Sequence, residues 1–218
     1  MPLSGSVVLV TGATGSIGRP LTEALLTAHA RLAIGVRRIE DVHPVDSALR
    51  QRGLSAFISP CDVRYEEDVV RLVHRVIRQF GRIDMLINAA MIDGLDERIV
   101  DYPVDPWRKV IATNLTGSYL LCREVLPWMT RQRRGCIALV QRAASSDSRP
   151  TPGVALVTWQ AVEALLQQLA GELNSTQVRL HALQIPPSGP SEPTGPAWVD
   201  AILKLAHDQA VRAPEPVN

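Results

Sequence analysis

Residues 6–18 read SVVLVTGATGSIG, an apolar run followed directly by a turn that contains three glycines. The run Ser6–Val10 is aliphatic at nearly every position, as expected of a strand that is covered on both faces. The turn then leads into a helical pattern. Glycines at such a junction let the backbone bend tightly and approach a pyrophosphate at the helix N-terminus. The stretch therefore predicts the first βα unit of an α/β domain that binds a dinucleotide.

This turn supplies the first group of candidate cofactor-binding residues. They are Gly12, Thr14, Gly15, Ser16, Ile17 and Gly18. Their position between a strand and a helix is what makes the glycine triplet informative, because a glycine-rich stretch elsewhere would carry much less weight. The alternative is that small residues here only allow the strand and the helix to pack closely.

Strands and helices alternate along the rest of the chain, with no internal repeat. Further strands are predicted at Leu32–Val36, Leu54–Ser59, Ile83–Ile87, Cys136–Val140 and Val178–Ile185. Helices are predicted at Ile17–Ala30, Glu66–Phe80, Pro106–Arg131, Val154–Leu173 and Trp198–His207. Such alternation is typical of a parallel sheet with helices on both faces. The expected fold is a three-layer α/β Rossmann fold with a doubly wound parallel sheet of about six strands.

The C-terminal region has a different composition. Seven of the 16 prolines follow Ile185, and Pro214 and Pro216 cannot donate the hydrogen bonds of a central strand. We therefore expect a single domain over residues 1–209, a tail over residues 210–218 and no strand after His207. A length of 218 residues agrees with one compact core.

Charge and composition exclude several classes of function. The 23 Lys plus Arg include only two lysines, and with 22 Asp plus Glu the net charge is +1, so no basic field for nucleic acid is expected. The chain contains no apolar run of 18 residues, and its first residues lack the pattern of a signal peptide. Its three cysteines and five histidines are scattered, without the spacing of a metal site. We expect a cytoplasmic protein that binds no membrane, no nucleic acid and no metal.

The end of the second predicted strand bears on the choice of cofactor. It reads Val36-Arg37-Arg38, at the place where an acid would bind the free ribose 2′-hydroxyl of NAD(H) and an arginine accommodates a 2′-phosphate. Two adjacent guanidinium groups favour NADP(H), because each can form paired hydrogen bonds with a phosphate. NAD(H) is the less favoured cofactor. A solvated basic pair on a surface turn is the alternative.

With these elements in order, the sequence resembles the short-chain dehydrogenase/reductase family from the first strand to about His207. Residues 81–90, GRIDMLINAA, are similar to the family's strand that leads into Asn-Asn-Ala-Gly, and Cys-Asp-Val at residues 61–63 is similar to its Asp-Val step beside the adenine. Residues 110–117, VIATNLTG, are similar to the segment that carries the family's active-site Asn, here Asn114. The resemblance implies cofactor contacts for five further residues, namely Asp62, Val63, Asn88, Ala89 and Ala90.

The chemistry of the family depends on residues that this sequence does not match. Family members carry a Ser, followed about 13 residues later by a Tyr-x-x-x-Lys pair in which the Tyr transfers a proton and the Lys lowers its pKa. In the register set by the fifth strand and the next helix, Arg142, Ala155 and Trp159 occupy the Ser, Tyr and Lys positions. Of the four catalytic positions, Asn114 alone is retained. The C-terminus is also expected to be shortened relative to the family, whose last strand has no counterpart here.

Two functions from different classes remain open, and a third, a lyase or isomerase that uses the same cleft without a cofactor, is supported by no residue pair. The first is an NADP(H)-binding relative without hydride-transfer chemistry, acting as a partner subunit, a sensor or a scaffold. The second is an NADP(H)-dependent oxidoreductase of the carbonyl reductase or alcohol dehydrogenase type that uses a non-standard proton donor. Neither hypothesis assigns a small-molecule substrate.

Association with a second chain is also expected, either as a homo-oligomer or as a heterodimer with an intact relative. Family members commonly associate through the helices that correspond to Leu115–Trp128 and Val162–Leu173. We expect apolar surface on these helices beyond what the sheet needs, at Leu120, Leu121, Leu165 and Leu169. The alternative is that both helices pack only on the sheet.

Overall fold

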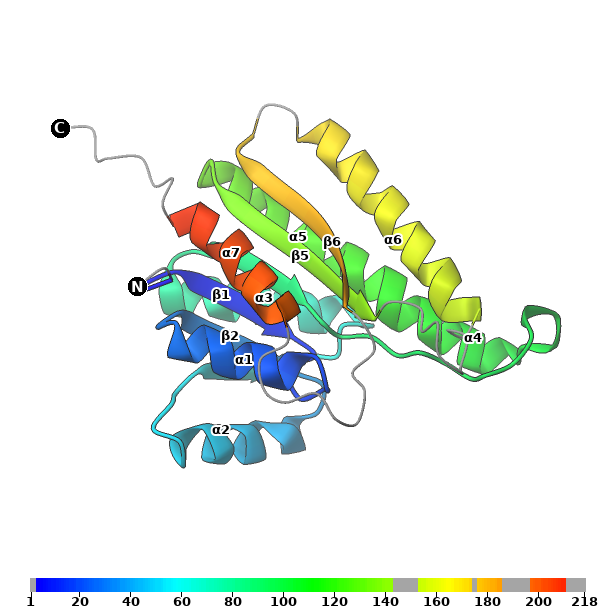
Figure 1. Ribbon diagram of the computed structural model, residues 1–218, viewed down its shortest axis with the longest axis horizontal. Coiled ribbons are helices and arrows are strands. Elements are labelled where there is room, and N and C mark those ends of the chain that lie inside the picture. Colours follow the sequence, from blue (N-terminus) through cyan, green and yellow to red (C-terminus); the bar gives the residue numbers. More distant parts are fainter. Residues whose placement is uncertain (1–2, 143–152, 174–175, 186–196, 211–218) are drawn as a thin grey trace.

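The computed structural model describes residues 3–142, 153–173, 176–185 and 197–210 (Figure 1). In this part of the chain six parallel strands form one sheet, in the order β3-β2-β1-β4-β5-β6. The strands are β1 (Val7–Thr11), β2 (Arg31–Val36), β3 (Phe57–Pro60), β4 (Met85–Asn88), β5 (Gly135–Arg142) and β6 (Val178–Ile185). The helices are α1 (Gly18–Thr27), α2 (Val42–Arg50), α3 (Glu66–Phe80), α4 (Val104–Val110), α5 (Gly117–Arg131), α6 (Gly153–Glu172) and α7 (Ala197–Ala210). The predicted six-stranded Rossmann fold is confirmed.

Helices cover both faces of the sheet, because successive side chains of each strand point to opposite sides. Val8 and Val10 of β1 belong to a core formed with α1, α2 and α7, whereas Val7 and Leu9 belong to a core formed with α3, α5 and α6. Figure 1 shows α7 in front of the sheet and α5 behind it. All five residues of β1 are buried, which explains the unbroken apolar run in the sequence.

The helix predicted at Glu66–Phe80 is confirmed with the same bounds as α3. Its first turn carries three acidic residues, which suit the positive end of the helix dipole. It ends at Gly81, whose φ of 77° is the left-handed conformation that glycine adopts without steric cost. Local sequence signals therefore define both ends of this element.

Two helical segments differ from the prediction. No helix is predicted from the sequence between the second and third strands, but α2 lies there, with Pro44 in its first turn, where a missing N–H is tolerated. The single helix predicted at Pro106–Arg131 begins at Val104 and is divided by a π-helical turn, Ile111–Thr116, between α4 and α5. Such π turns have i→i+5 hydrogen bonds and occur frequently at functional sites.

Apolar surface on α5 and α6 is distributed differently from the prediction. Leu120 and Leu121 lie in the core beside α3 and the sheet, so the prediction that they offer free surface is wrong. Their side of α5 faces inward because α5 packs on the sheet beside α3. Leu165 and Leu169 are half-buried.

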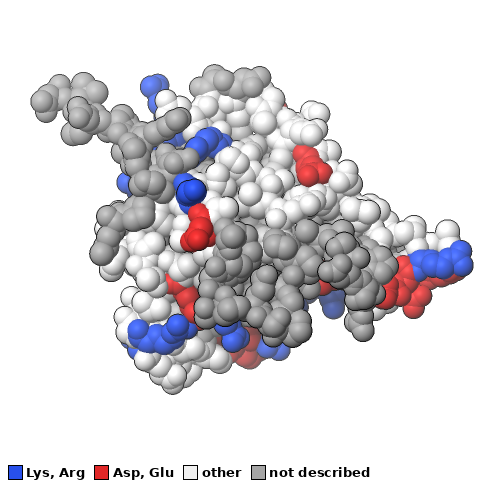
Figure 2. All heavy atoms as spheres, in the orientation of Figure 1, with Lys and Arg blue, Asp and Glu red and all other residues white. Residues whose placement is uncertain are grey.

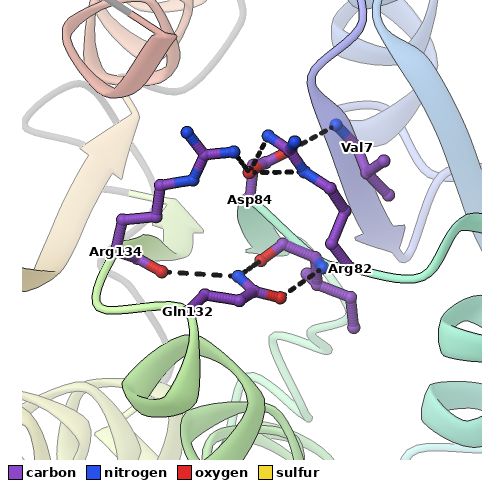
Figure 3. A network of polar contacts seen from close by, with 6 residues as sticks. Val7, Arg82, Asp84, Gln132 and Arg134 are labelled. Carbon is purple, nitrogen blue, oxygen red and sulfur yellow. Dashed lines mark hydrogen bonds and ion pairs between the residues drawn. The ribbon is translucent and has the colours of Figure 1, made fainter. Parts of the chain in front are cut away.

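A network of polar contacts fixes the amino-terminal edge of the sheet (Figure 3). The buried Asp84 carboxylate, just before β4, accepts a hydrogen bond from the Val7 N–H of β1 at 2.9 Å and from Arg82 Nε at 2.8 Å. Arg134, just before β5, lies 3.3 Å from the same carboxylate. The Gln132 side chain accepts from the Ile83 N–H at 3.1 Å and donates to the Ile83 carbonyl at 2.8 Å. We call this network the Asp84 clamp, and it ties three neighbouring strands together at one end.

The predictions for the C-terminus fall only partly within the described residues. α7 extends to Ala210, and the proposed tail and the absence of a strand at residues 211–218 lie outside them. Among the helices that are described, none combines the length and the apolar composition needed to cross a membrane.

Candidate functional site

A cleft of about 250 Å³ opens at the carboxyl ends of the central strands. Chain order reverses there, because β1 lies between β2 and β4, and ligands of open α/β sheets bind at such a switch point. The cleft is lined by Gly12, Thr14, Gly15, Gly35, Arg37, Asp41, Cys61, Asp62, Val63, Arg64, Ala89, Ala90, Met91, Ile92, Lys109 and Thr113. Residues from five separate stretches of sequence therefore meet at one edge of the sheet.

The glycine turn forms one wall of the cleft. Gly12 has a φ of 74°, and a Cβ there would overlap the backbone of Ala89 and Ala90. A Cβ on Gly18 would overlap the Gly12 carbonyl, so Gly18 allows close packing of α1 and does not line the cleft. The wall is therefore built mainly of backbone, as a bound pyrophosphate requires.

Two other members of the predicted turn lie outside the cleft. Ile17 is buried in the core beside α1, and Ser16 is exposed at the start of that helix. The structure thus brings Gly12, Thr14 and Gly15 into the cleft and places the remaining three predicted residues behind or beside it.

Asn88 positions the opposite wall without lining the cleft. Its side chain is buried at the end of β4, where its Oδ1 accepts hydrogen bonds from Thr11 Oγ1 at 2.8 Å and from the Ala90 N–H at 3.0 Å. Its Nδ2 donates to Ser118 Oγ at 3.0 Å. These bonds fix the backbone of Ala89 and Ala90, which do line the cleft.

The two arginines after β2 are placed differently. Arg37 lines the cleft, whereas Arg38 pairs with Asp41 at 2.7 Å and is absent from the cleft lining. Of the pair predicted to bind a 2′-phosphate, only Arg37 is directed into the site.

Asp62 and Val63, for which the resemblance implies cofactor contacts, both line the cleft. The Asp62 carboxylate is held by Arg64, with Arg64 Nη2 at 2.6 Å and Nε at 2.9 Å. Burial alone would raise the pKa of Asp62, but the hydrogen bonds from Arg64 and the charges of Arg64 and Arg37 outweigh it and lower that pKa below its usual range. Asp62 is therefore ionised and already has a cationic partner.

Asn114 lies in the π-helical turn, and its side chain is engaged with protein groups. Its Oδ1 accepts from the Ile92 N–H at 2.9 Å, and its Nδ2 donates to the Ile92 carbonyl at 2.9 Å and to Thr158 Oγ1 at 3.2 Å. The amide thus fixes the loop after β4 against α6.

Ala155 and Trp159 lie near the start of α6, one helical turn apart. Both are buried, and the Ala155 carbonyl accepts a hydrogen bond from Thr158 Oγ1 at 2.8 Å. The Trp159 indole N–H is buried and has no hydrogen-bond partner among the described residues. Arg142 is the last residue of β5, and its side chain lies outside the described part of the structure. Neither Ala155 nor Trp159 is among the described residues that line the cleft of the glycine turn.

Several residues that line the cleft are missing from the sequence-based prediction. Lys109 and Thr113 come from α4 and the π turn, one helical turn apart and next to Asn114, and this spacing was the signal that could have identified them.

Burial, followed by the charges of Asp68 and Asp62, raises the pKa of Cys61 to about 12, so its thiol stays protonated at neutral pH. Across the described residues, no three His, Cys, Asp or Glu side chains come together as a metal site would need.

Comparisons with known proteins agree with the geometry. The short chain dehydrogenase family matches residues 6–189. Dehydrogenase/reductase SDR family member 4 of Bos taurus is 30% identical over 182 residues, which cover 84% of this chain and 65% of that protein. The human protein of the same name is 29% identical over 184 residues. The chain thus spans about 65% of the length of the curated relatives it matches first.

Solved structures show the same likeness. A metagenomic short-chain oxidoreductase in complex with NADP superposes with a TM-score of 0.80 at 26% identity, covering 95% of this chain and 93% of that one. NAD⁺-bound xylitol dehydrogenase superposes with a TM-score of 0.78 at 28% identity, covering 93% and 76%. The match over most of the chain, together with the glycine turn at the switch point of a six-stranded sheet, shows that this chain belongs to the short-chain dehydrogenase/reductase family.

Proposed function

We propose that the chain binds NADP(H), with the adenosine and pyrophosphate of the cofactor in the cleft of the glycine turn. The observation that carries this proposal is the convergence of Gly12 and Gly15 with the backbone of Ala89 and Ala90 at the switch point. A cradle of backbone groups that a Cβ would fill fits a pyrophosphate. Arg37 in the same cleft favours NADP(H), because a guanidinium can bind a 2′-phosphate.

We further propose that the chain lacks the ordinary proton transfer of its family. A bound nicotinamide would supply a hydride donor or acceptor, but in the register of the family Ala155 and Trp159 replace the Tyr and Lys that move the proton and hold the ribose. The Asn114 side chain is occupied by Ile92 and Thr158. Loss of a positioned proton donor costs about 10²- to 10⁴-fold in rate. A non-redox role as a partner subunit, a sensor or a scaffold follows.

The alternative is an NADP(H)-dependent oxidoreductase with a non-standard proton donor. Lys109 and Thr113 favour it to a limited extent, because they are protic side chains that line the cleft on the side of α4. The protonated Cys61 thiol, with its pKa of about 12, is a poor proton donor at neutral pH.

Calorimetric titration with NADPH and NADH tests cofactor binding. We expect saturable binding of NADPH that is tighter than binding of NADH. The Arg37→Met variant should lose about tenfold in NADPH affinity, because a charge-assisted hydrogen bond to phosphate is removed. Arg78→Met, a matched change at an exposed position on α3, should leave binding unchanged. Absence of binding by both dinucleotides would contradict the proposal.

Activity measurements separate the two functions. The unchanged chain should not oxidise NADPH with a panel of ketones and aldehydes. The double variant Ala155→Tyr, Trp159→Lys restores the family's proton donor and its cation, and slow NADPH oxidation by it would locate the loss at these two positions. Rapid turnover by the unchanged chain would contradict the non-redox proposal and favour the alternative.

We also propose that the chain associates through α6, with a second copy or with an intact relative. Leu156 and Val157 are 49% and 44% exposed, and Glu163 is the one charged residue between Gly153 and Gly171. In Figure 2 the surface over α6 is largely free of charged side chains. A helix face of this kind on a protein surface is typical of an interface.

Light scattering tests this association. The Val157→Glu variant should shift the protein toward the monomer, because a carboxylate would be buried in an apolar contact. Gln79→Glu, at an exposed position on α3, adds the same charge elsewhere. A monomer at all concentrations, both alone and with candidate relatives, would contradict the proposal.

A further inference from the structure

The loop that follows β2 contains a carboxylate beside the cation proposed to bind the cofactor. Arg37 and Asp41 both line the cleft, and Arg38 lies between them in the sequence. Arg38 donates two hydrogen bonds to Asp41, from Nη2 to Oδ1 at 2.7 Å and from Nε to Oδ2 at 3.1 Å. Arg38 thus pairs with a carboxylate that lies in the cleft wall, although Arg38 itself does not line the cleft.

Both side chains of the Arg38–Asp41 pair are charged, and Arg38 can exchange Asp41 for another anion. The hydrogen bond from Arg38 lowers the pKa of Asp41, burial opposes it, and the charges of Arg38 and Arg37 lower it further, so Asp41 is ionised at neutral pH. The Arg38 and Asp41 side chains are 62% and 25% exposed. Ion pairs with this exposure contribute little net free energy, since solvent screens them. A stronger anion that arrives in the cleft can therefore take Arg38 from Asp41.

We propose that Asp41 is a specificity-determining residue that competes with the 2′-phosphate of NADP(H) for Arg38. This inference rests on the proposed cofactor binding. A phosphate group at the end of β2 would meet Arg37 directly, and it would also meet the negative charge of Asp41 in the same cleft wall. Asp41 therefore lowers the preference for NADP(H) over NAD(H), because it neutralises Arg38 and repels the phosphate.

Asp41→Asn removes the charge while keeping the size of the side chain. We expect the affinity for NADPH to rise about three- to tenfold and the affinity for NADH to change less than about twofold, because only NADPH carries the 2′-phosphate. The same comparison is made with 2′,5′-ADP and ADP, which carry the adenosine end alone. The result then does not depend on the nicotinamide end.

A matched pair on the same segment gives the control. Asp46 and Arg50 of α2 form an ion pair at 2.7 Å, and neither lines the cleft of the glycine turn. Asp46→Asn changes the net charge by the same amount and should leave both affinities unchanged. In an Arg38→Gln background, Asp41→Asn should raise NADPH affinity less than it does in the parent, because the competition for Arg38 is gone.

The outcomes separate the inference from the proposed function. Binding of NADPH with an NADPH-to-NADH affinity ratio that Asp41→Asn leaves unchanged, or lowers, would overturn the role of Asp41 and leave cofactor binding intact. If the chain bound 2′,5′-ADP but not NADPH, the failure would lie at the nicotinamide end. The effect of Asp41→Asn on the ratio of the affinities for 2′,5′-ADP and ADP would then decide the role of Asp41. Binding of none of the four nucleotides would overturn both.

Discussion

Replacement of Asn114 by Ala should destabilise the fold, because the amide connects three parts of the site. The side chain is buried and makes three hydrogen bonds, two to the Ile92 backbone and one to Thr158. Each such bond contributes about 1 kcal/mol net, and the Ile92 N–H and carbonyl would be left without this partner. The structure therefore predicts a loss of about 3 kcal/mol in the free energy of unfolding.

Urea unfolding monitored by circular dichroism measures this loss. Thr158→Val is the matched control, because it removes one of the three bonds to the amide together with the Thr158 hydrogen bond to Ala155. Thr158→Val should lower the free energy of unfolding by about 1 to 2 kcal/mol. If Asn114→Ala lowered the free energy of unfolding no more than Thr158→Val, the assignment of Asn114 to positioning the loop after β4 would be refuted.

Three further changes are expected to give defined results. Gly12→Ala should strongly lower the free energy of unfolding, and with it the melting temperature, because it combines a positive φ with backbone overlap. Gly53→Ala, at a φ of 69° in open space, should lower the free energy of unfolding by only about 1 to 2 kcal/mol. Equal losses of unfolding free energy in the two variants would contradict a steric overlap at Gly12. Asp84→Ala should cost about 2 to 3 kcal/mol in chemical unfolding, because the Val7 N–H and two guanidinium groups lose their acceptor; a cost below 1 kcal/mol would contradict the role of the clamp. Burial, followed by the charge of Arg179, lowers the pKa of His181 in the folded chain. In the unfolded chain the pKa of this histidine is the ordinary value of about 6.5, so as the pH falls the unfolded chain takes up the proton before the folded chain does. Stability should therefore fall between pH 7 and pH 5, and fall less in His181→Asn; parallel pH profiles of Tm would show that His181 does not contribute.

Sequence signals predicted the fold where several local signals coincided in one element. α3 has an amphipathic pattern, an acidic first turn and a terminal glycine, so both of its ends could be placed. α2 has nine residues with an internal Pro44, which is too short for the pattern to stand out. Pro106–Arg131 is divided at the π turn that carries Asn114, whose bonds to Ile92 and Thr158 link distant parts of the sequence and are encoded by no local pattern.

The candidate site was predictable where backbone geometry decides it. Gly12 and Gly15 could be assigned from their place after the first strand. The different directions of Arg37 and Arg38 could not, because they depend on a carboxylate three residues further along that captures one of the two. The contribution of Lys109 to the cleft likewise depends on how α4 docks against the carboxyl edge of the sheet.

The Asp84 clamp has a consequence for the order in which the chain folds. Its bond to the Val7 N–H joins residues 77 positions apart and closes a loop that contains the first three βα units of the chain. Non-local contacts of this kind are slow to form, and those made after the transition state govern the unfolding rate. We expect the clamp to form after the transition state, so that breaking it accelerates unfolding and leaves the refolding rate nearly constant.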